Sequence, residues 1–387
     1  MAENFGQAAG SNGNWTGLAL RSLITKSGAL ELSLENEIIE APGHGEVIIR
    51  VEATPINPSD IGLLLGAADR TSLMAQNTSD RILTSGTVPH YYLRAMGERL
   101  DIPLTVGNEG AGIVVAAGPD EYSQSLIGRT AAAMPTGMYC QYRRVRTEDC
   151  LILPVGTVPA EAASCFVNPL TALGLVATAM QEGHRAVVQT AAASSLGRML
   201  NRICQADGIQ IVNIVRSKEQ ATALRQDGAT YICNSSEESF RKDLDEALAK
   251  TGATVVFDAI GGGKLVSQIL GQIETIASRN SETYSVYGST LRKAAYLYGS
   301  LDPSPTELKR TLGRYWTVSG WLLGNFTDDQ SPDIVRALKE RVGAELNTTF
   351  RTSYTDTISL VEALDPVLIA EYCKTSTGRK YLINPAL

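Results

Sequence analysis

The residues with the clearest chemical pattern form one turn near the middle of the chain. An apolar run, Ala186–Thr190, leads into small residues and then into a helix-like segment. Small side chains let the backbone approach a pyrophosphate, and the N–H groups at a helix start stabilise its charge. Read as Gly-x-Gly-x-x-Gly, the key positions are Ala192, Ser194 and Gly197, and only the last is glycine. The turn predicts a dinucleotide site, although the same residues also suit a tightly packed strand-to-helix turn. The residues expected to bind the pyrophosphate are Ala193, Ser194, Ser195, Leu196 and Gly197.

The residues after the next expected strand, Ile209–Val215, indicate which dinucleotide would bind. An acidic residue about 20 positions after the glycines would bind a ribose 2′-hydroxyl. Here that position holds Arg216, followed by Ser217 and Lys218. Since these side chains are donors suited to a 2′-phosphate, the segment favours NADP(H) over NAD(H). The alternative is a solvated basic start to the next helix.

Two kinds of element would position these residues. Before residue 150, short apolar runs are separated by Gly, Pro and Asn, which predicts a mainly β region. From Pro159 onward, strand-like and helix-like segments alternate, which predicts a parallel sheet with helices on both faces. The expected β runs of the first part are Gly17–Ile24, Glu46–Ala53, Gly112–Ala117 and Thr130–Met134. The expected elements of the second part are Ala186–Thr190, Gly197–Asp207, Ile209–Val215, Glu219–Asp227, Ala229–Cys233, Glu237–Lys250 and Thr254–Phe257.

The last sixty residues and one early stretch complete the expected organisation. Ser331 before Pro332 predicts a helix start, and the helix should continue to about Glu345. Further expected elements are a strand at Phe350–Tyr354, a helix at Ile358–Ala370 and a strand at Tyr381–Ile383. The stretch Ala67–Asp101 is too long for an ordinary connection, which favours a lid, a binding loop or an interaction surface.

Composition excludes several classes of function. The chain has 387 residues, enough for two domains, and carries 34 Lys and Arg against 41 Asp and Glu. The net charge of −7 disfavours nucleic-acid binding. A membrane span is not expected either, because the sequence lacks a run of about 18 apolar residues. Residues 1–16 lack the pattern of a secretory signal and are expected to be flexible. Six scattered cysteines predict reduced thiols and a cytoplasmic protein. They are Cys140, Cys150, Cys165, Cys204, Cys233 and Cys373.

Several motifs in order along the chain resemble the medium-chain dehydrogenase/reductase superfamily, in its zinc-free quinone reductase and 2-enoyl reductase branch. The resemblance extends from about Gly45 to Pro385, except for Ala67–Asp101. The matching segments are Gly45–Val51, Asn57–Asp60, Gly107–Gly112, Gly137–Tyr142, Asn168–Ala172, the turn Ala191–Gly197, Val256–Gly262 and Thr377–Leu382.

The resemblance implies an α/β fold with two domains. A GroES-like, β-rich catalytic domain would comprise residues 17–160 and 346–387, with 67–101 as an insertion. A Rossmann domain, a doubly wound parallel sheet, would comprise residues 161–345 and bind NADPH. The resemblance also implies a homodimer that acts on a small-molecule substrate. No nucleic-acid or membrane partner is expected, because of the net charge and the short apolar runs described above.

The resemblance also assigns residues to the cofactor site. It implies that Asn57 faces the nicotinamide and the reacting carbonyl, and that Thr171 supports the nicotinamide ring. Asp60 and Glu109 would tie loops together. The segment Tyr287-Gly288-Ser289 is taken to follow the fifth Rossmann strand and to cover the nicotinamide face. Trp321 and Leu322 match the sixth-strand segment, although core packing explains Trp321 nearly as well.

The residues that bind zinc in related dehydrogenases are absent here. The first ligand position falls at Ile56 to Pro58, the second is Asn108, and Cys165 alone cannot hold Zn²⁺. No metal site is therefore expected, and acceptors that need no Lewis acid are favoured. The leading hypothesis is an NADPH-dependent, zinc-independent reductase of a quinone or of an activated C=C bond, such as an enone or a 2-enoyl thioester. The alternatives are a carbonyl reductase and an NADP(H)-binding sensor or scaffold.

A proton donor is the missing part of the resemblance. Enoyl reductases of this branch carry a Tyr shortly after the Asn-Pro-Ser-Asp motif, and the segment Gly62–Asp69 has none. His90, Tyr91 and Tyr92 are candidates for a general acid because they lie in the unusual stretch near Asn57. The alternative is that at least one tyrosine packs the stretch onto the barrel.

Overall fold

The computed structural model describes residues 13–78, 82–282, 284–374 and 379–387. The chain divides into two compact units, one comprising residues 1–167 and 339–387 and the other residues 168–338. Each boundary falls inside or at the end of a helix, whereas the sequence analysis placed them at 160 and 345. The sheets described below agree with the predicted fold class, a GroES-like β-rich domain with a Rossmann domain.

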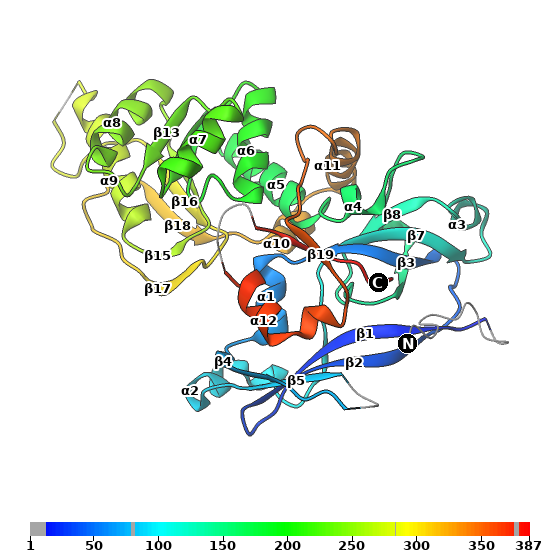
Figure 1. The fold of residues 1–387 in the computed structure, drawn as a ribbon. Coiled ribbons are helices and arrows are strands. Elements are labelled where there is room, and N and C mark those ends of the chain that lie inside the picture. Colours follow the sequence, from blue (N-terminus) through cyan, green and yellow to red (C-terminus); the bar gives the residue numbers. More distant parts are fainter. Residues whose placement is uncertain (1–12, 79–81, 283, 375–378) are drawn as a thin grey trace. The chain divides into compact units, whose positions relative to one another are not determined.

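The first unit contains two sheets (Figure 1). One sheet has the order β4-β5-β2-β1-β6, and the other has the order β10-β8-β7-β3-β20-β19, with β9 also paired to β3. Strands of the first sheet are β1 (Trp15–Ile24), β2 (Ala29–Ile39), β4 (Asp69–Ala75), β5 (Leu83–Thr87) and β6 (Leu104–Thr105). Strands of the second are β3 (Glu46–Pro55), β7 (Gly110–Ala117), β8 (Thr130–Ala133), β9 (Tyr142–Arg146), β10 (Cys150–Ile152), β19 (Asp356–Ile358) and β20 (Tyr381–Ile383).

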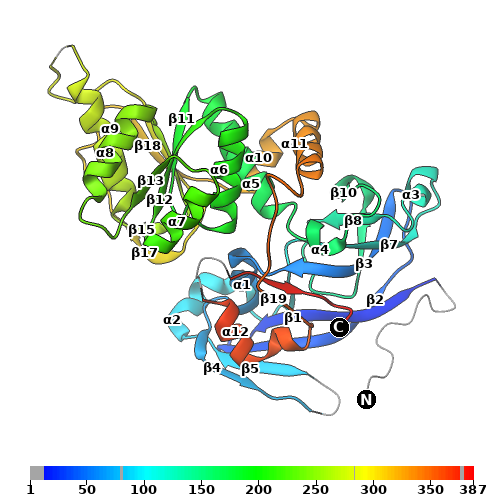
Figure 2. The same ribbon diagram turned by 45° about the horizontal axis from the view of Figure 1, so that its top comes forward.

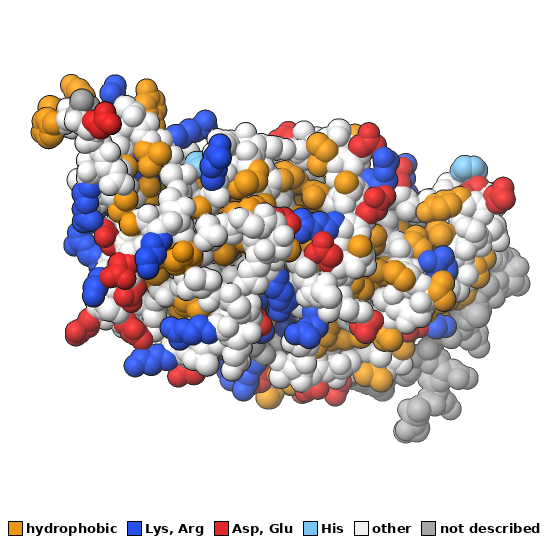
Figure 3. Space-filling view, turned by 90° about the horizontal axis from the view of Figure 1, so that it is seen from above, with side chains coloured by type: hydrophobic (Ala, Val, Ile, Leu, Met, Phe, Trp, Pro, Cys, Tyr) orange, Lys and Arg blue, Asp and Glu red, His pale blue; other side chains and the backbone are white. Residues whose placement is uncertain are grey.

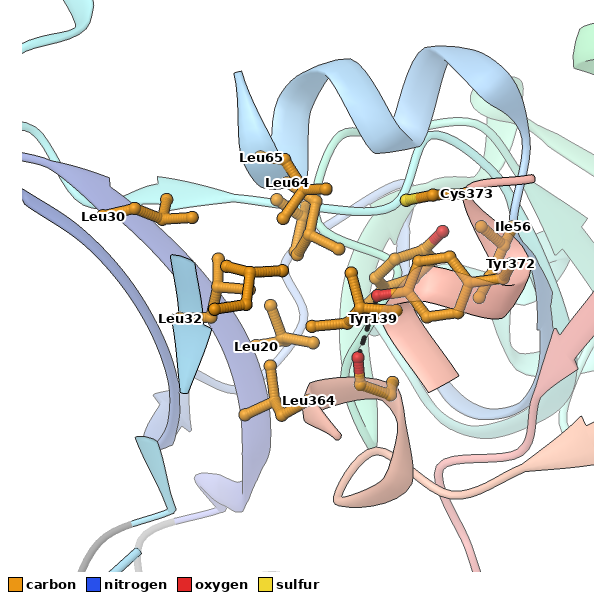
Figure 4. Packing of buried hydrophobic residues seen from close by; sticks show 14 of the residues in the cluster. Leu20, Leu30, Leu32, Ile56, Leu64, Leu65, Tyr139, Leu364, Tyr372 and Cys373 are labelled. Atoms are coloured by element: carbon orange, nitrogen blue, oxygen red, sulfur yellow. Dashed lines mark hydrogen bonds between the residues drawn. The ribbon is translucent and has the colours of Figure 1, made fainter. Parts of the chain in front are cut away.

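Short helices complete the first unit and cover its core. They are α1 (Pro58–Leu65), α2 (His90–Leu93), η1 (Arg94–Arg99), α3 (Glu121–Ser125), η2 (Thr147–Asp149), α4 (Pro159–Ala162), η3 (Glu362–Leu364) and α12 (Pro366–Tyr372). Figure 4 shows leucines of β1 and β2 facing residues from α1 and from the C-terminal segment. Leu20 and Leu364 are both almost fully buried there, so segments more than 300 residues apart share one core.

The second unit is a parallel sheet with the strand order β13-β12-β11-β14-β16-β18. Its strands are β11 (Ala186–Gln189), β12 (Gln210–Val215), β13 (Tyr231–Asn234), β14 (Val255–Asp258), β16 (Lys293–Leu297) and β18 (Trp316–Gly320), and β15 (Gly261–Gly263) pairs separately with β17 (Asp302–Thr306). Its helices are α5 (Val167–Gln181), α6 (Ser195–Ala206), α7 (Lys218–Gln226), α8 (Phe240–Thr251), α9 (Leu265–Arg279), α10 (Leu323–Asp329) and α11 (Pro332–Ala344), the last of which crosses into the first unit. The chain runs outward from β11 through α6 and α7, then reverses through α8 and α9. Right-handed crossovers therefore place these two pairs of helices on opposite faces (Figure 2).

Three expectations about the elements are wrong. Residues 1–12 lie outside the described part, but Trp15 and Thr16, predicted to be flexible, belong to β1 because the Trp15 ring packs 5.1 Å from Tyr142. The strand expected at Phe350–Tyr354 is absent from that segment, since ladder hydrogen bonds begin only at Thr355. The helix expected at Ile358–Ala370 is interrupted because Asp365 and Pro366 begin a new helix, α12.

The stretch Ala67–Asp101 is a folded part of the first sheet. It forms β4, β5, α2 and η1, apart from residues 79–81, which lie outside the described part. Leu73, Val88 and Leu93 are buried in the core that Figure 4 samples. The stretch therefore extends the sheet, and a role as a lid or binding loop stays a prediction.

One helical stretch corrects the expectation about apolar length. Residues 159–181 are long and apolar enough to cross a membrane by length and composition, with a mean hydropathy of 1.5. However, 78% of its most apolar window is buried inside the protein, as expected of a core helix.

On the face in Figure 3, Lys and Arg side chains lie among Asp and Glu side chains.

Candidate functional site

The predicted pyrophosphate turn lies between β11 and α6 in the second unit. Ala191 has a φ of 47°, in the left-handed region that residues with a side chain rarely adopt. This turn directs the chain into α6, where the Ser194 hydroxyl accepts a hydrogen bond from Gly197 N at 3.1 Å. Ala192 and Ala193 are buried beneath the turn. The remaining N–H groups of the first helical turn are oriented as an anion site requires.

Gly197 allows the helix to lie directly on the strand end. A Cβ at this position would lie 2.5 Å from Ala192 O and 2.7 Å from Ala192 C, distances that Cβ atoms essentially never show. Gln189 in β11 also holds the start of α6 against the strand, because its Nε2 donates to Gly197 O at 2.9 Å. The surviving glycine of the motif is thus required for close helix–strand packing.

The basic segment after β12 lies at the position expected to bind the ribose of a dinucleotide. Arg216 and Lys218 are exposed, and Ser217 begins α7 by accepting a hydrogen bond from Gln220 N at 3.3 Å. A cavity of about 280 Å³ borders Lys218. Its lining includes the cation of Arg225, the carboxylates of Glu237 and Asp243, and the neutral side chains of Thr222 and Asn234. The segment therefore offers cations, while the Ser217 hydroxyl is partly engaged in helix capping.

The segment expected on the nicotinamide side is misplaced in the sequence analysis. Tyr287-Gly288-Ser289 precedes β16 rather than following it. It therefore lies at the amino ends of the parallel strands, whereas the pyrophosphate turn lies at their carboxyl ends. Tyr287 is exposed, and Ser289 donates its N–H and hydroxyl to the Glu274 carboxylate at 2.7 and 2.6 Å. Lys293 completes this buried group, with its Nζ 2.7 Å from Glu274 Oε2. The segment anchors the start of β16.

A second Tyr-Gly-Ser triplet, Tyr298 to Ser300, follows β16 at its carboxyl end. Parallel sheets bind ligands at the carboxyl ends of their strands, and β16 lies on the opposite side of β11 from β12, the strand predicted to precede the ribose site. The Tyr298 hydroxyl is buried and has no hydrogen-bond partner among the described residues. Burial, followed by the charge of Asp258, raises the pKa of Tyr298, so the phenol stays neutral. Tyr298 was not among the residues expected from the sequence, although the repeated Tyr-Gly-Ser triplet was a visible signal.

The other residues expected to bind the cofactor differ in their surroundings. Trp321 is buried in the second unit, where its Nε1 donates to Thr178 Oγ1 at 3.1 Å and its ring packs 5.6 Å from Phe326. It therefore serves as core packing there. Leu322 is exposed, and Thr171 is buried in α5. A contact of these three residues with the cofactor stays a prediction.

Asn57 in the first unit lies in a fixed and buried position at the end of β3. Its Nδ2 donates to Glu109 Oε1 at 2.8 Å, and its backbone N–H donates to Asp60 Oδ2 at 2.8 Å. Its Oδ1 is buried and has no partner among the residues that the structure describes. Because Glu109 fixes the amide, Asn57 holds an acceptor atom ready for a donor group.

The buried carboxylates of Glu109 and Asp60 join separate loops through hydrogen bonds, as the resemblance implied. Glu109 Oε2 accepts the N–H groups of Phe166 and Val167, both at 2.9 Å. Asp60 Oδ1 accepts Asn108 N at 2.8 Å. Burial raises the pKa of both carboxyls, that of Asp60 to about 7. Hydrogen bonds from the backbone oppose this effect.

Three residues to which the sequence assigned no role in the site join this group. Lys380 Nζ donates to Ser164 Oγ at 2.8 Å, and Ser164 Oγ lies 2.8 Å from the Tyr354 hydroxyl. Lys380 belongs to the matched segment Thr377–Leu382, which was a signal for its importance. Neither Ser164 nor Tyr354 stands in a recognisable motif.

The predicted general acids lie apart from this group. His90 begins α2 and is exposed, and Tyr91 and Tyr92 are also exposed, with their rings packed 4.2 Å from each other. The hydrogen bonds of the described residues join none of them to Asn57. A hydrogen bond with Tyr92 is the main cause of a raised pKa for Tyr91. A role for either tyrosine as proton donor stays a prediction without support from this geometry.

The described residues include no group of three or more His, Cys, Asp or Glu side chains placed to hold a metal ion. The six cysteines are free and buried. The expectation of a zinc-independent protein stays a prediction.

Two family models match the chain on either side of the pyrophosphate turn. The alcohol dehydrogenase GroES-like domain matches residues 43–191, and the zinc-binding dehydrogenase model matches residues 195–277. A mitochondrial enoyl-[acyl-carrier-protein] reductase of Caenorhabditis elegans is 27% identical over 273 residues, which cover 68% of each chain. A quinone oxidoreductase of Pseudomonas aeruginosa is 27% identical over 184 residues, covering 47% of this chain and 57% of that protein. A solved structure from Mesorhizobium loti is 23% identical, with a TM-score of 0.70 and coverage of 96% and 99%.

Proposed function

Because the chain belongs to the medium-chain dehydrogenase/reductase superfamily, in the branch of quinone oxidoreductases and enoyl reductases, we propose that this oxidoreductase is an NADPH-dependent reductase. It transfers hydride, without zinc, to a quinone or to an activated C=C bond of an enone or 2-enoyl thioester. The observation that carries the proposal is the turn at Ala191–Gly197, which combines buried small residues, a capped helix start and close helix–strand packing. The relatives named above supply the two acceptor classes.

NADPH is preferred over NADH in this proposal because of the segment after β12. The position that would hold a carboxylate for a 2′-hydroxyl holds Arg216, and Lys218 is exposed two residues later. A bound 2′-phosphate would gain charge-assisted hydrogen bonds from these side chains, each contributing about 1.5–3 kcal/mol. A carboxylate is absent from residues 216–218, so nothing in this segment repels the phosphate.

The bound nicotinamide supplies the hydride, and the residues of the chain position the reactants. The first turn of α6 holds the pyrophosphate. Asn57 presents Oδ1 as an acceptor, and Glu109 prevents the amide from rotating because it binds Nδ2. Tyr298 offers an unpaired phenol hydroxyl on the nicotinamide side of the sheet.

We also propose that the protein is a homodimer in the cytoplasm. The strand β18 ends the sheet order of the second unit, and its outer edge is available to the same strand of a second copy. The six free thiols suit a reducing compartment. Sedimentation of the purified chain as a monomer would contradict the dimer.

Oxidation of NADPH and NADH, followed by nicotinamide absorbance, tests the proposed function. The acceptors are benzoquinone, cyclohexenone and crotonyl-CoA. We expect turnover with NADPH to exceed that with NADH, and replacing both Arg216 and Lys218 by alanine to reduce this preference at least about 10-fold. The matched control is Lys242→Ala, which removes an exposed cation from α8. NADPH binding without turnover of any acceptor would contradict the reductase and favour a sensor or scaffold. A preference for NADH would contradict the 2′-phosphate assignment.

A further inference from the structure

Tyr354, Ser164 and Lys380 form a hydrogen-bonded chain in the first unit. The Tyr354 hydroxyl and Lys380 Nζ each lie 2.8 Å from Ser164 Oγ. Lys380 Nζ also lies 5.9 Å from the centroid of the Tyr354 ring, within the range of a cation–π contact. Ser164 is buried, whereas Tyr354 is only partly buried. Ser164 follows α4, Tyr354 precedes β19 and Lys380 precedes β20.

The chemistry of the three groups fixes the direction of the hydrogen bond from Lys380 and allows one from Ser164 to Tyr354. A lysine ammonium donates and cannot accept, so Ser164 Oγ accepts from Lys380. The Ser164 hydroxyl has one proton of its own, which it can then donate to the Tyr354 oxygen. In this arrangement, the Tyr354 O–H is left for another acceptor. With this orientation, the phenol is the end of a series of hydrogen bonds whose protons all point the same way.

The register of the second sheet brings Lys380 to the end of β3, the strand that Asn57 follows. Leu382 pairs with Pro55 in the antiparallel pair of β20 and β3, and Ile56 N donates to Tyr381 O at 3.0 Å. Continuing the register by one residue sets Lys380 opposite Asn57. The lysine thus lies at the strand end that carries the residue expected to meet the reacting carbonyl.

The surrounding charges suit a proton relay. Burial lowers the pKa of Lys380, and the Glu109 and Asp60 carboxyls oppose this effect. Burial raises the pKa of Tyr354; its hydrogen bond with Ser164 opposes the rise, and Glu109 and Cys165 add to it. The phenol therefore remains neutral, while the ammonium releases a proton more readily than an exposed lysine does.

We propose that Tyr354 is the proton donor of the reaction and that Ser164 and Lys380 resupply its proton. This inference rests on the proposed reductase function. Hydride adds to the acceptor with its electron pair and leaves an enolate or a hydroquinone anion. The Tyr354 O–H bond breaks, its electrons stay on the phenol oxygen, and the proton passes to that anion. A proton then moves from Ser164 to Tyr354 and from Lys380 to Ser164, and the neutral amine takes one from water.

The experiment compares kcat and the pH profile of variants with NADPH and the three acceptors named above. Tyr354→Phe is expected to lower kcat about 100-fold, the usual contribution of a general acid. The dissociation constant of NADPH, measured by fluorescence, should change less than about 2-fold because the pyrophosphate turn lies in the other unit. The matched control is Tyr372→Phe, since the Tyr372 hydroxyl is buried and donates to Ala363 O at 2.9 Å. The control should retain kcat.

Substitutions of Lys380 distinguish a proton relay from a charge that only stabilises the fold. In the unmodified protein, kcat should fall as the pH rises through the lowered pKa of Lys380, and this limb should disappear in Lys380→Met. Lys380→Arg keeps the charge but cannot release its proton, so a relay predicts that it stays slow. A charge that only supports the fold predicts recovery by Lys380→Arg. Ser164→Ala provides a second test of the same chain if Tyr354→Phe is unstable.

Three outcomes would overturn the assignment, and each contradicts a different part of it. Tyr354→Phe with kcat within about 3-fold of the unmodified chain contradicts the role of Tyr354 alone. Recovery of kcat and of the high-pH limb by Lys380→Arg contradicts the relay. Absence of turnover in the unmodified chain with all three acceptors contradicts the reductase function and the proton donor together.

Discussion

Replacing Gly197 by alanine tests the packing of α6 on the end of β11. The new Cβ would lie 2.5 Å from Ala192 O, whereas ordinary contacts begin at 3.4 Å, so the helix must move by about 0.9 Å. Gln189 and the Ser194 cap hold the helix start and resist this movement. Overpacking of this kind costs about 1–3 kcal/mol. For a domain of this size, that cost lowers Tm by roughly 2–12 °C.

The movement should also weaken cofactor binding. The N–H groups at the start of α6 would leave their positions around the pyrophosphate, and losing one charge-assisted hydrogen bond costs roughly 1.5 kcal/mol, or about 10-fold in Kd. Differential scanning calorimetry gives Tm, and quenching of protein fluorescence by NADPH gives Kd. The matched control is Gly271→Ala in α9, where the nearest atom to a new Cβ, Leu312 Cδ2, lies 3.9 Å away.

The control reverses the sign of the expected effect. Alanine is a better helix former than glycine by about 1 kcal/mol, so Gly271→Ala should raise Tm slightly. The same propensity term favours Gly197→Ala, and only the contact with Ala192 makes that variant less stable. An unchanged or higher Tm for Gly197→Ala, together with an unchanged Kd for NADPH, would refute the packing argument.

Three further predictions concern buried polar groups. Lys293→Met leaves the Glu274 carboxylate buried without its cation and should cost about 3–5 kcal/mol in urea unfolding. Burial opposes ionisation of Glu274, but hydrogen bonds from Lys293 and Ser289 lower its pKa to about 2, so the unmodified protein should lose this stability only as the pH falls from about 4.3 toward 2. Loss of the same stability above pH 5 would contradict the lowered pKa of Glu274. The pKa of Asp60 is raised by burial to about 7, so the folded state binds its proton more tightly and stability should decline between about pH 4 and 7. Asp60→Asn should flatten that decline in a series of Tm measurements, and an equal slope would show that another group titrates. Tyr298→Phe removes an unpartnered buried hydroxyl, so stability should change by less than about 1 kcal/mol while NADPH binding weakens about 3–10-fold. Equal weakening of the 2′-phospho-ADP-ribose fragment, which lacks nicotinamide, would place the contact elsewhere.

The alternation of the second unit was predictable because local signals mark both ends of its helices. Gly208 and Gly228 adopt positive φ values of 69° and 81° just after α6 and α7, as the sequence indicated. The helix starting at Pro332 was predicted in the same way and is confirmed. These signals depend on the residues within one or two turns, so the sequence alone carries them.

Identical local patterns explain the error at the fifth strand. The triplet Tyr-Gly-Ser occurs at 287–289 and again at 298–300, and both copies border β16. The strand itself, Lys293–Leu297, was not among the expected elements. Its first residue is a lysine, which strand patterns disfavour, and only the buried partner Glu274 makes that lysine acceptable. The partner lies in α9, outside any local window.

The surroundings of Asn57 show the limit of reading a site from one segment of sequence. Asn57 was identified from its motif, but its partner Glu109 is 52 residues away and Lys380 is more than 300 residues away. Their proximity depends on the antiparallel register of β20 against β3, and a one-residue slip would place Lys380 on the other face of the sheet. The C-terminal segment therefore supplies a cation to the end of β3 that no property of residues 54–60 predicts. A proton donor sought only near that motif leads to the exposed Tyr91 and Tyr92. The register leads instead to Tyr354, whose hydroxyl is joined to Lys380 through Ser164.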